Sequence, residues 1–182
     1  MIGIDESRQF QPVSIAILTV SDTRTPADDA SGDALAERIT KAGHRLVTRA
    51  IERDDPPGIE ARLRAWIADP AIDVIITSGG TGITGRDVTP EVFERVLDKK
   101  LEGFGELFRM LSYNKIRTST MQSRALGGVA AGTYLFALPG SPGAVKDAWD
   151  DTLLYQLDSR HRPCNLVELM PRLMEHGEGV AS

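Results

Sequence analysis

The sequence predicts an α/β fold built on an open, mainly parallel β-sheet. Short apolar runs rich in β-branched residues alternate along the chain with segments whose apolar residues recur at helical spacing. Two of these runs, IAILTV and VIITS, are nearly continuous in apolar residues. Such continuity is typical of strands that helices cover on both faces, which is the usual situation in parallel sheets.

Four strands are expected from these runs. They span residues 13–20, 45–51, 72–78 and 132–140. In an open α/β sheet, ligands bind beyond the carboxyl ends of the strands, so the segments that follow the strands are the candidates for a site. These segments are residues 21–24, 53–55, 77–87 and 139–143.

The first helix is expected between the first two strands, where Leu35 and Ile39 share one face. Either Ser31 or Asp33 is available to cap its N-terminus. Gly43 follows the apolar pattern at the position where a glycine commonly ends a helix.

Two further helices begin at prolines. Asp55 and Pro56 provide a cap and a first-turn proline for the second helix, and the third begins at Thr89 and Pro90. The remaining two helices are expected at residues 104–111 and 142–153.

Length and charge narrow the class of protein. The 182 residues fit one domain, and the polar ends at residues 1–12 and 175–182 are expected to be poorly ordered tails. The net charge of -5, without a block of Lys or Arg, disfavours nucleic-acid binding. The start of the chain lacks a signal-peptide pattern, and no apolar run is long enough to span a bilayer. We therefore expect a cytoplasmic protein without a membrane partner.

Cysteine and histidine provide no sign of a site. Cys164 is the only cysteine, so an intrachain disulfide is impossible, and we expect it to be a small packed residue. The three histidines, His44, His161 and His176, have no metal-site spacing and are expected at the surface or at helix caps.

The run TSGGTG, at residues 77–82, has the composition of a phosphate-binding loop. Its glycines allow a sharp turn that presents several backbone N–H groups, while Thr77, Ser78 and Thr81 add hydroxyl groups. It matches neither the Walker A nor the GxGxxG spacing. A tight turn without a ligand is the alternative, but three glycines and three hydroxyls exceed what a turn requires.

A second glycine loop follows the fourth strand. The run LPGSPG places Gly140 and Ser141 ahead of a helix, whose N-terminus favours anions. A plain helix cap explains this run equally well. Two such loops on neighbouring strands are more informative, because a ligand with two phosphate-bearing ends could lie between them.

Asp54 and Asp87 are the acidic candidates. Mg²⁺ prefers one or two carboxylates together with phosphate oxygens and water, so these residues suit a magnesium-phosphate site. The alternatives are that Asp87 closes a turn or caps the helix at Thr89, and that Asp54, not Asp55, caps the following helix.

Positive charge for a phosphate ligand could come from four side chains. They are Arg86, Lys115, Arg117 and Arg124. A solvated helix face explains the last three nearly as well.

Four motifs, in this order and spacing, resemble the molybdenum cofactor biosynthesis proteins MoaB and MogA, a family related to the G domain of gephyrin. The motifs are TSGGTGITGRDVTP, GFGELFRML, QSRA and LPGSP. The resemblance covers about residues 13–167, which leaves residues 1–12 and 168–182 as terminal extensions. The runs FRMLS, TSTMQSRA and LDSRHRPCN resemble the MoaB branch more than the MogA branch.

The resemblance implies a three-layer α/β/α sandwich that assembles as a trimer or hexamer. It also implies an Mg²⁺-dependent reaction with ATP, in which the terminal phosphate of molybdopterin attacks the α-phosphate of ATP to give adenylyl-molybdopterin and pyrophosphate. Asp54 and Asp87 match the two catalytic aspartates of the family and are expected to hold Mg²⁺. Other pathway proteins are possible partners.

Ligand contacts are expected from several loops. The residues are Ser21, Asp22, Thr77, Ser78, Gly79, Gly80, Thr81, Gly82, Ser123, Arg124, Pro139, Gly140 and Ser141. The alternative function is a non-catalytic molybdopterin-binding or oligomeric protein that acts beside a separate MogA-type adenylyltransferase. Retention of both aspartates together with TSGGTG favours the enzyme, because a disused cleft has no chemical need for them.

Overall fold

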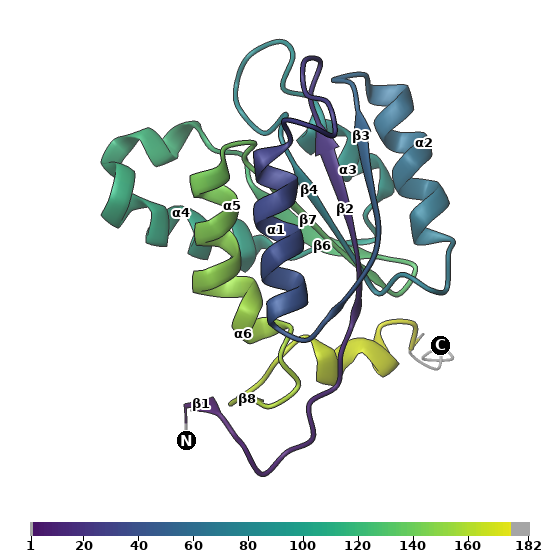
Figure 1. Cartoon of the computed structure of the whole chain (residues 1–182), viewed down its shortest axis with the longest axis vertical. Coiled ribbons are helices and arrows are strands. Elements are labelled where there is room, and N and C mark those ends of the chain that lie inside the picture. Colours follow the sequence, from purple (N-terminus) through teal and green to yellow (C-terminus); the bar gives the residue numbers. More distant parts are fainter. Residues whose placement is uncertain (1, 176–182) are drawn as a thin grey trace, which may run out of the picture.

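The computed structural model describes residues 2–175 and has a six-stranded sheet at its centre (Figure 1). Across the sheet, the strands are β3 (Arg45–Glu52), β2 (Ser14–Val20), β4 (Val74–Ser78), β7 (Thr133–Leu138), β6 (Leu126–Ala130) and β5 (Lys99–Lys100). The first four are parallel to one another, and β6 pairs antiparallel with both β7 and β5. The expected mainly parallel sheet is therefore confirmed.

Helices cover both faces of this sheet (Figure 1). One face is covered by α1 (Ala30–Lys41), α4 (Glu102–Ile116) and α5 (Pro142–Ala148), which continues through a π-helical turn (Trp149–Leu153) into α6 (Leu154–Gln156). The other face is covered by α2 (Pro56–Ile67) and α3 (Thr89–Val96). This arrangement confirms the three-layer α/β/α sandwich.

Each central strand contributes to two separate apolar cores. In β2, Ile17 packs into the core under α1, α4 and α5, whereas its neighbour Leu18 packs into the core under α2 and α3. Alternate side chains of a strand point to opposite faces, so a strand buried on both faces needs an apolar residue at nearly every position. All seven residues of β2 and all five of β4 are buried, as the continuous apolar runs predicted.

The hairpin of β6 and β7 was not anticipated, because β6 contains two glycines, which are depleted in strands. A Cβ at Gly127 would lie 2.8 Å from the ring of Phe136, and one at Gly128 would lie 2.5 Å from the carbonyl oxygen of Lys99. Packing therefore requires both glycines. Ala131 and Gly132 form the turn, both with positive φ, as a tight hairpin turn requires.

The helix starts were predicted with mixed success. Asp55 caps α2 by accepting a hydrogen bond from the Gly58 N–H at 3.0 Å, as expected. The cap of α1 is Asp29, which accepts from the Gly32 N–H at 2.9 Å, so the expectation of Ser31 or Asp33 was wrong. Helix α1 begins at Ala30, so Ser31 already lies in its first turn and not at the capping position.

The segment before the first central strand is tied to the domain. In it, β1 (Gly3–Ile4) pairs antiparallel with β8 (His161–Arg162), and the Gln11 N–H donates to Ser159 Oγ at 2.9 Å. The expectation of a loose tail was therefore wrong for residues 2–12. For the C-terminal tail, residues 176–182 lie outside the described residues.

Two other expectations need correction. Cys164 is exposed and not packed. His44 is buried, its Nδ1 accepts from the Val13 N–H at 3.2 Å, and burial lowers its pKa to about 4. His176 lies outside the described residues. Among residues 2–175, none of the helices has the length and apolar character needed to cross a membrane.

Candidate ligand-binding site

The two predicted glycine loops touch each other at the carboxyl ends of β4 and β7. These strands are neighbours and parallel, and the Gly79 N–H donates to the Leu138 carbonyl at 2.9 Å. Gly79 has a φ of +109°, and a Cβ there would overlap the carbonyl oxygen of Val20. A Cβ at Gly140 would lie 3.1 Å from the Gly79 Cα. Glycine is therefore needed in both loops for this close approach.

The loop after β4 is fixed to the start of α3. Thr89 donates twice, from its Oγ1 to the Gly79 carbonyl at 2.9 Å and from its N–H to the Gly80 carbonyl at 3.0 Å. Gly80 has a φ of +63°, which lets its carbonyl turn toward the helix. Thr89, which the sequence marked only as a helix start, thus sets the shape of the loop.

A pocket of about 250 Å³ lies beside the glycine loops. Seven of its lining residues were expected to bind ligand or metal: Gly80, Thr81, Gly82, Asp87, Ser123, Pro139 and Gly140. Six others come from α4 and the 3₁₀ segment after it (Arg117–Gln122), and the sequence did not identify them: Phe108, Ser112, Ile116, Ser119, Thr120 and Gln122. Helix α4 thus forms the wall opposite the glycine loops.

Asp54 lies against the first glycine loop and beside Asp22. The Asp22 N–H donates to Asp54 Oδ2 at 3.0 Å, and the Asp54 N–H donates to Asp22 Oδ1 at 3.3 Å. Asp54 Oδ1 lies 3.2 Å from the position that a Cβ of Gly80 would take. Burial raises the pKa of Asp54 above its ordinary value, and the negative charges of Asp22 and Asp87 raise it further.

Asp22 has a different environment from Asp54. Arg86 Nε donates to Asp22 Oδ2 at 3.1 Å, and the second nitrogen of the same fork, Nη2, also contacts this oxygen. The hydrogen bond from Arg86 holds the pKa of Asp22 below its ordinary value. Asp22 is therefore ionised and paired, whereas Asp54 has no arginine partner of its own among the described residues.

Asp87 closes its own loop and does not cap α3. Its Oδ2 accepts from the Thr84 N–H at 2.8 Å and from Thr84 Oγ1 at 2.6 Å. Helix α3 has no side-chain cap. Burial raises the pKa of Asp87, but the hydrogen bonds from Thr84 and Gly82 outweigh it and leave the pKa below its ordinary value. Of the two alternatives, the structure shows the turn, and Asp87 is negative at neutral pH.

Arg124 holds the loop that carries Asp87. Its Nε donates to the Gly82 carbonyl at 2.6 Å and its Nη2 to the Asp87 carbonyl at 2.7 Å, while Nη1 pairs with Glu91. Its backbone N–H donates to the Thr81 carbonyl at 2.9 Å. These contacts fix the shape of the loop, and direct contact of Arg124 with a ligand stays a prediction.

The other two cations of the NKIRTSTMQSR segment lie away from the glycine loops. Lys115 pairs with Asp147 at 2.7 Å and with Asp151 at 3.0 Å, and Arg117 stacks over the ring of Tyr113. These contacts agree with the alternative that Lys115 and Arg117 belong to a solvated helix face.

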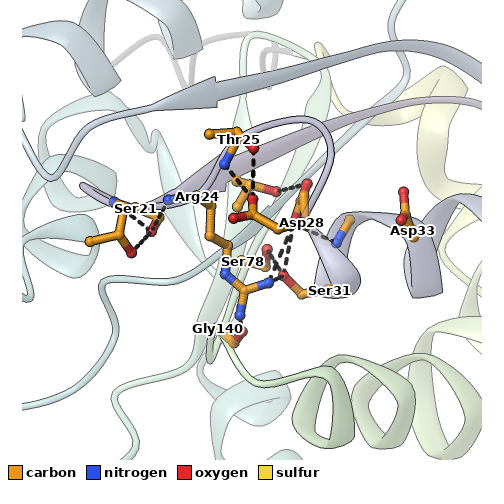
Figure 2. A network of polar contacts seen from close by, with 12 residues as sticks. Ser21, Arg24, Thr25, Asp28, Ser31, Asp33, Ser78 and Gly140 are labelled. Carbon is orange, nitrogen blue, oxygen red and sulfur yellow. Dashed lines mark hydrogen bonds and ion pairs between the residues drawn. The ribbon is translucent and has the colours of Figure 1, made fainter.

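Four hydroxyl residues of the predicted site are buried or hydrogen-bonded within the protein. The hydroxyls of Thr77 and Ser78 are fully buried beneath the loop, and Thr77 Oγ1 has no hydrogen-bond partner in the described part of the chain. Ser21 Oγ accepts from the Arg24 N–H at 3.2 Å (Figure 2). Ser141 caps α5 by accepting from the Ala144 N–H at 3.2 Å. Their roles as ligand contacts stay predictions.

The donor set fits Mg²⁺ carried on a phosphate ligand. Among residues 2–175, no three or more His, Cys, Asp or Glu side chains are grouped closely enough to hold a metal by themselves. Asp54 and Asp87, on either side of residues 80–82, offer the one or two carboxylates that Mg²⁺ uses when phosphate oxygens and water supply the rest.

Fold and pocket together define a class: a three-layer α/β protein with a glycine-lined pocket at the carboxyl ends of its strands. The family model described as "Probable molybdopterin binding domain" matches residues 16–159. Molybdenum cofactor biosynthesis protein B of Escherichia coli (strain K12) is 48% identical over 159 residues, which is 87% of this chain and 94% of that protein.

Solved structures agree with this assignment. A crystal structure of molybdenum cofactor biosynthesis protein B has a TM-score of 0.80 and 44% identity, and the match covers 82% of this chain and 94% of that one. The tungsten cofactor synthesizing protein MoaB from Pyrococcus furiosus has a TM-score of 0.70 and 35% identity, with 78% and 90% covered. The chain therefore belongs to the MoaB/MogA family of molybdenum cofactor biosynthesis proteins.

Proposed function

We propose that this protein acts in molybdenum cofactor biosynthesis by transferring the adenylyl group of Mg-ATP to molybdopterin. In the reaction, an oxygen of the terminal phosphate of molybdopterin forms a bond to the α-phosphorus of ATP, and the bond from that phosphorus to pyrophosphate breaks. The supporting observation is that Asp54 and Asp87 flank a pocket-lining glycine loop, which touches a second glycine loop.

The chain's own groups would chiefly position and neutralise the reactants, which is most of what nucleotidyl transfer requires of a protein. Backbone N–H groups of residues 80–82 would bind phosphate oxygens, and the N-terminus of α5 at Gly140 and Ser141 would favour a second phosphate. Asp54 and Asp87 would hold Mg²⁺, which supplies positive charge to the phosphates when bound. Arg124 would keep Asp87 in place through the loop carbonyls.

The alternative function is non-catalytic, and in it the protein only binds molybdopterin beside a separate MogA-type enzyme. A cleft that holds a pterin phosphate through its glycine loops alone would have the same geometry.

Calorimetric titration with ATP, with and without Mg²⁺, separates the two functions. The enzyme should bind ATP more tightly when Mg²⁺ is present, because the metal links the phosphates to Asp54 and Asp87. Asp87→Asn should abolish this Mg²⁺ dependence, whereas Asp55→Asn, at the α2 cap, should retain it. Tight molybdopterin binding without any ATP binding by the wild type would reject the enzyme in favour of the binding protein.

We further propose that the protein is a homo-oligomer, a trimer or a hexamer, formed through α4 and the segment after it. Two aromatic residues of α4, Phe104 and Phe108, are buried in the core. Other large apolar side chains of this region are exposed by 39% to 82%: Leu107, Met110, Tyr113, Ile116 and Met121. Several exposed large apolar side chains in one segment are typical of an interaction surface. The proposed function implies a cytoplasmic setting and contact with other pathway proteins.

A further inference from the structure

A polar network links the segment after β2 to both glycine loops. We call it the Asp29 network, and it consists of Arg24, Asp29, Ser31, Ser78 and Gly140. Figure 2 shows Arg24 extending from its loop toward Ser31 and Gly140, with Ser78 close by. The network joins segments that are far apart in the sequence, since Arg24 and Gly140 are 116 positions apart.

Asp29 is a buried anion at the centre of this network. It is 2% exposed and accepts from Thr19 Oγ1 at 2.7 Å, Ser31 Oγ at 3.1 Å, the Gly32 N–H at 2.9 Å and Arg49 Nη2 at 3.3 Å. A buried carboxylate is costly unless it is paired and hydrogen-bonded, and this one is both. Its orientation is therefore fixed by four donors from three segments of the chain.

Ser31 connects Asp29 to the first glycine loop through hydrogen bonds. Its hydroxyl, fully buried, donates to Asp29 Oδ1 and accepts from Arg24 Nη1 at 3.2 Å and from Ser78 Oγ at 3.4 Å. A serine hydroxyl has one donor and two acceptor positions, so all of its capacity is used. Ser78 immediately precedes Gly79 at the end of β4.

Arg24 connects Ser31 and Asp29 to the second glycine loop. Its Nη1 lies 3.7 Å from Asp29 Oδ1, and its Nη2 donates to the Gly140 carbonyl at 3.2 Å. The guanidinium is planar and carries its donors in a fixed fork, so two of its contacts, on Ser31 and on Gly140, are held at a set separation.

We propose that Arg24 is a positioning residue that sets the separation of the two glycine loops, with Asp29 holding its guanidinium in place. This inference rests on the proposed function, in that the loops are taken to hold two phosphate groups. Because hydrogen bonds weaken steeply when distance and angle are poor, loss of Arg24 should weaken the binding of a ligand that spans both loops.

The chain offers a matched control in Arg49. Both arginines pair with Asp29, at 3.7 Å for Arg24 and 3.3 Å for Arg49, but Arg49 directs its other nitrogen to Asp33 on α1 and does not contact a glycine loop. Arg24→Gln and Arg49→Gln therefore remove the same charge from the same buried carboxylate. Only the first also breaks the connection to Gly140.

The test measures the dissociation constants of Mg-ATP and of inorganic phosphate by calorimetry, together with the melting temperature of each variant. For Mg-ATP, Arg24→Gln should weaken binding by on the order of 10-fold and Arg49→Gln by less than about 2-fold. Inorganic phosphate is too small to span both loops, so Arg24→Gln should weaken its binding less than that of Mg-ATP. Arg24→Lys, the milder variant, should not restore affinity, because one ammonium cannot replace the two-point fork.

Each outcome separates the inference from the proposed function. If the wild type binds no Mg-ATP, the proposed function fails and this inference fails with it. If the wild type binds but Arg24→Gln matches Arg49→Gln, or if Arg24→Lys binds like the wild type, only the inference is overturned. If Arg24→Gln weakens the binding of Mg-ATP and of inorganic phosphate by the same factor, the inference is also overturned, because an equal loss indicates damage to a single loop.

Discussion

At the residue scale, three aspartates near the first glycine loop have different electrostatic environments. Asp22 is paired with Arg86, and Asp87 is stabilised by hydrogen bonds from its own loop. Asp54 is close enough to the negative charges of both for them to raise its pKa, and within residues 2–175 it forms no ion pair. Catalytic carboxylates are commonly held in such unfavourable surroundings, at some cost in stability. A magnesium ion would relieve the repulsion.

Asp54 provides a prediction about stability and pH. Because its folded-state pKa is raised by burial and by Asp22 and Asp87, its contribution to stability is favourable below its ordinary value of 3.8 and is lost as the pH rises through the folded-state pKa. Asp54→Asn should therefore raise the melting temperature at pH 7, without Mg²⁺, by on the order of 1–3 °C. The gain should disappear at pH 3.

Thermal melts of Asp54→Asn and Asp55→Asn at both pH values check this prediction. Asp55→Asn should change little at pH 7, since Asn caps a helix about as well as Asp. A lower melting temperature for Asp54→Asn at pH 7 would show that its carboxylate stabilises the fold and is not held there under strain.

Sequence alone could identify the chemistry of these residues but not their partners. Asp54, Asp87 and TSGGTG were recognisable because carboxylates, glycines and hydroxyls follow strand ends, where parallel sheets place their sites. The roles of Arg24, Asp29 and Arg124 depend on contacts between distant segments. Such contacts leave no periodic or local signal, so these residues were either missed or, for Arg124, expected to face the ligand.

At the scale of elements, the strands that carry the site were predicted well, and the edge of the sheet was not. Strands β2 and β4 are buried on both faces, so their apolar runs are unambiguous. Strand β6 has the sequence LGGVA, whose glycines are explained only by the packing of Phe136 and Lys99 against them. Its antiparallel pairing to β7 therefore could not be read from the sequence.

Substitution of Gly79 by alanine tests whether the close contact of the two loops requires glycine. Gly79→Ala should lower the free energy of unfolding by about 2–5 kcal/mol, from the strain of a φ of +109° and the overlap with the Val20 carbonyl. Gly103→Ala, on α4 with no heavy atom within 4 Å of its Cβ position, is the control and should not destabilise. Urea denaturation measures both, and a loss below about 0.5 kcal/mol for Gly79→Ala would contradict the tight junction.

At the scale of the whole molecule, helix α4 has two different sides. Its inner side lines the pocket through Phe108 and Ser112, and its outer side exposes Met110 and Tyr113. The sequence predicted a helix over residues 104–111, but it could not show which of the apolar residues of this helix pack into the core. An oligomer formed through the outer side would also hold the pocket wall in place.

Light scattering tests the assembly. We expect the wild type to be a trimer or hexamer at micromolar concentration and Met110→Lys to shift it toward the monomer, because a buried unpaired charge is strongly unfavourable in an interface. Val47→Lys, on β3 and 43% exposed, is the control and should leave the assembly intact. A wild type that is monomeric throughout would reject the α4 interface.

Pyrophosphate release from Mg-ATP in the presence of molybdopterin tests most directly whether the pocket beside the two glycine loops transfers an adenylyl group. The wild type should release pyrophosphate only when molybdopterin is added, and Asp87→Asn should reduce the rate by on the order of 100-fold or more while remaining folded, because it removes a preorganised charge from the magnesium site. A wild type that binds molybdopterin tightly but releases no pyrophosphate, or an Asp87→Asn variant as active as the wild type, would contradict this proposal.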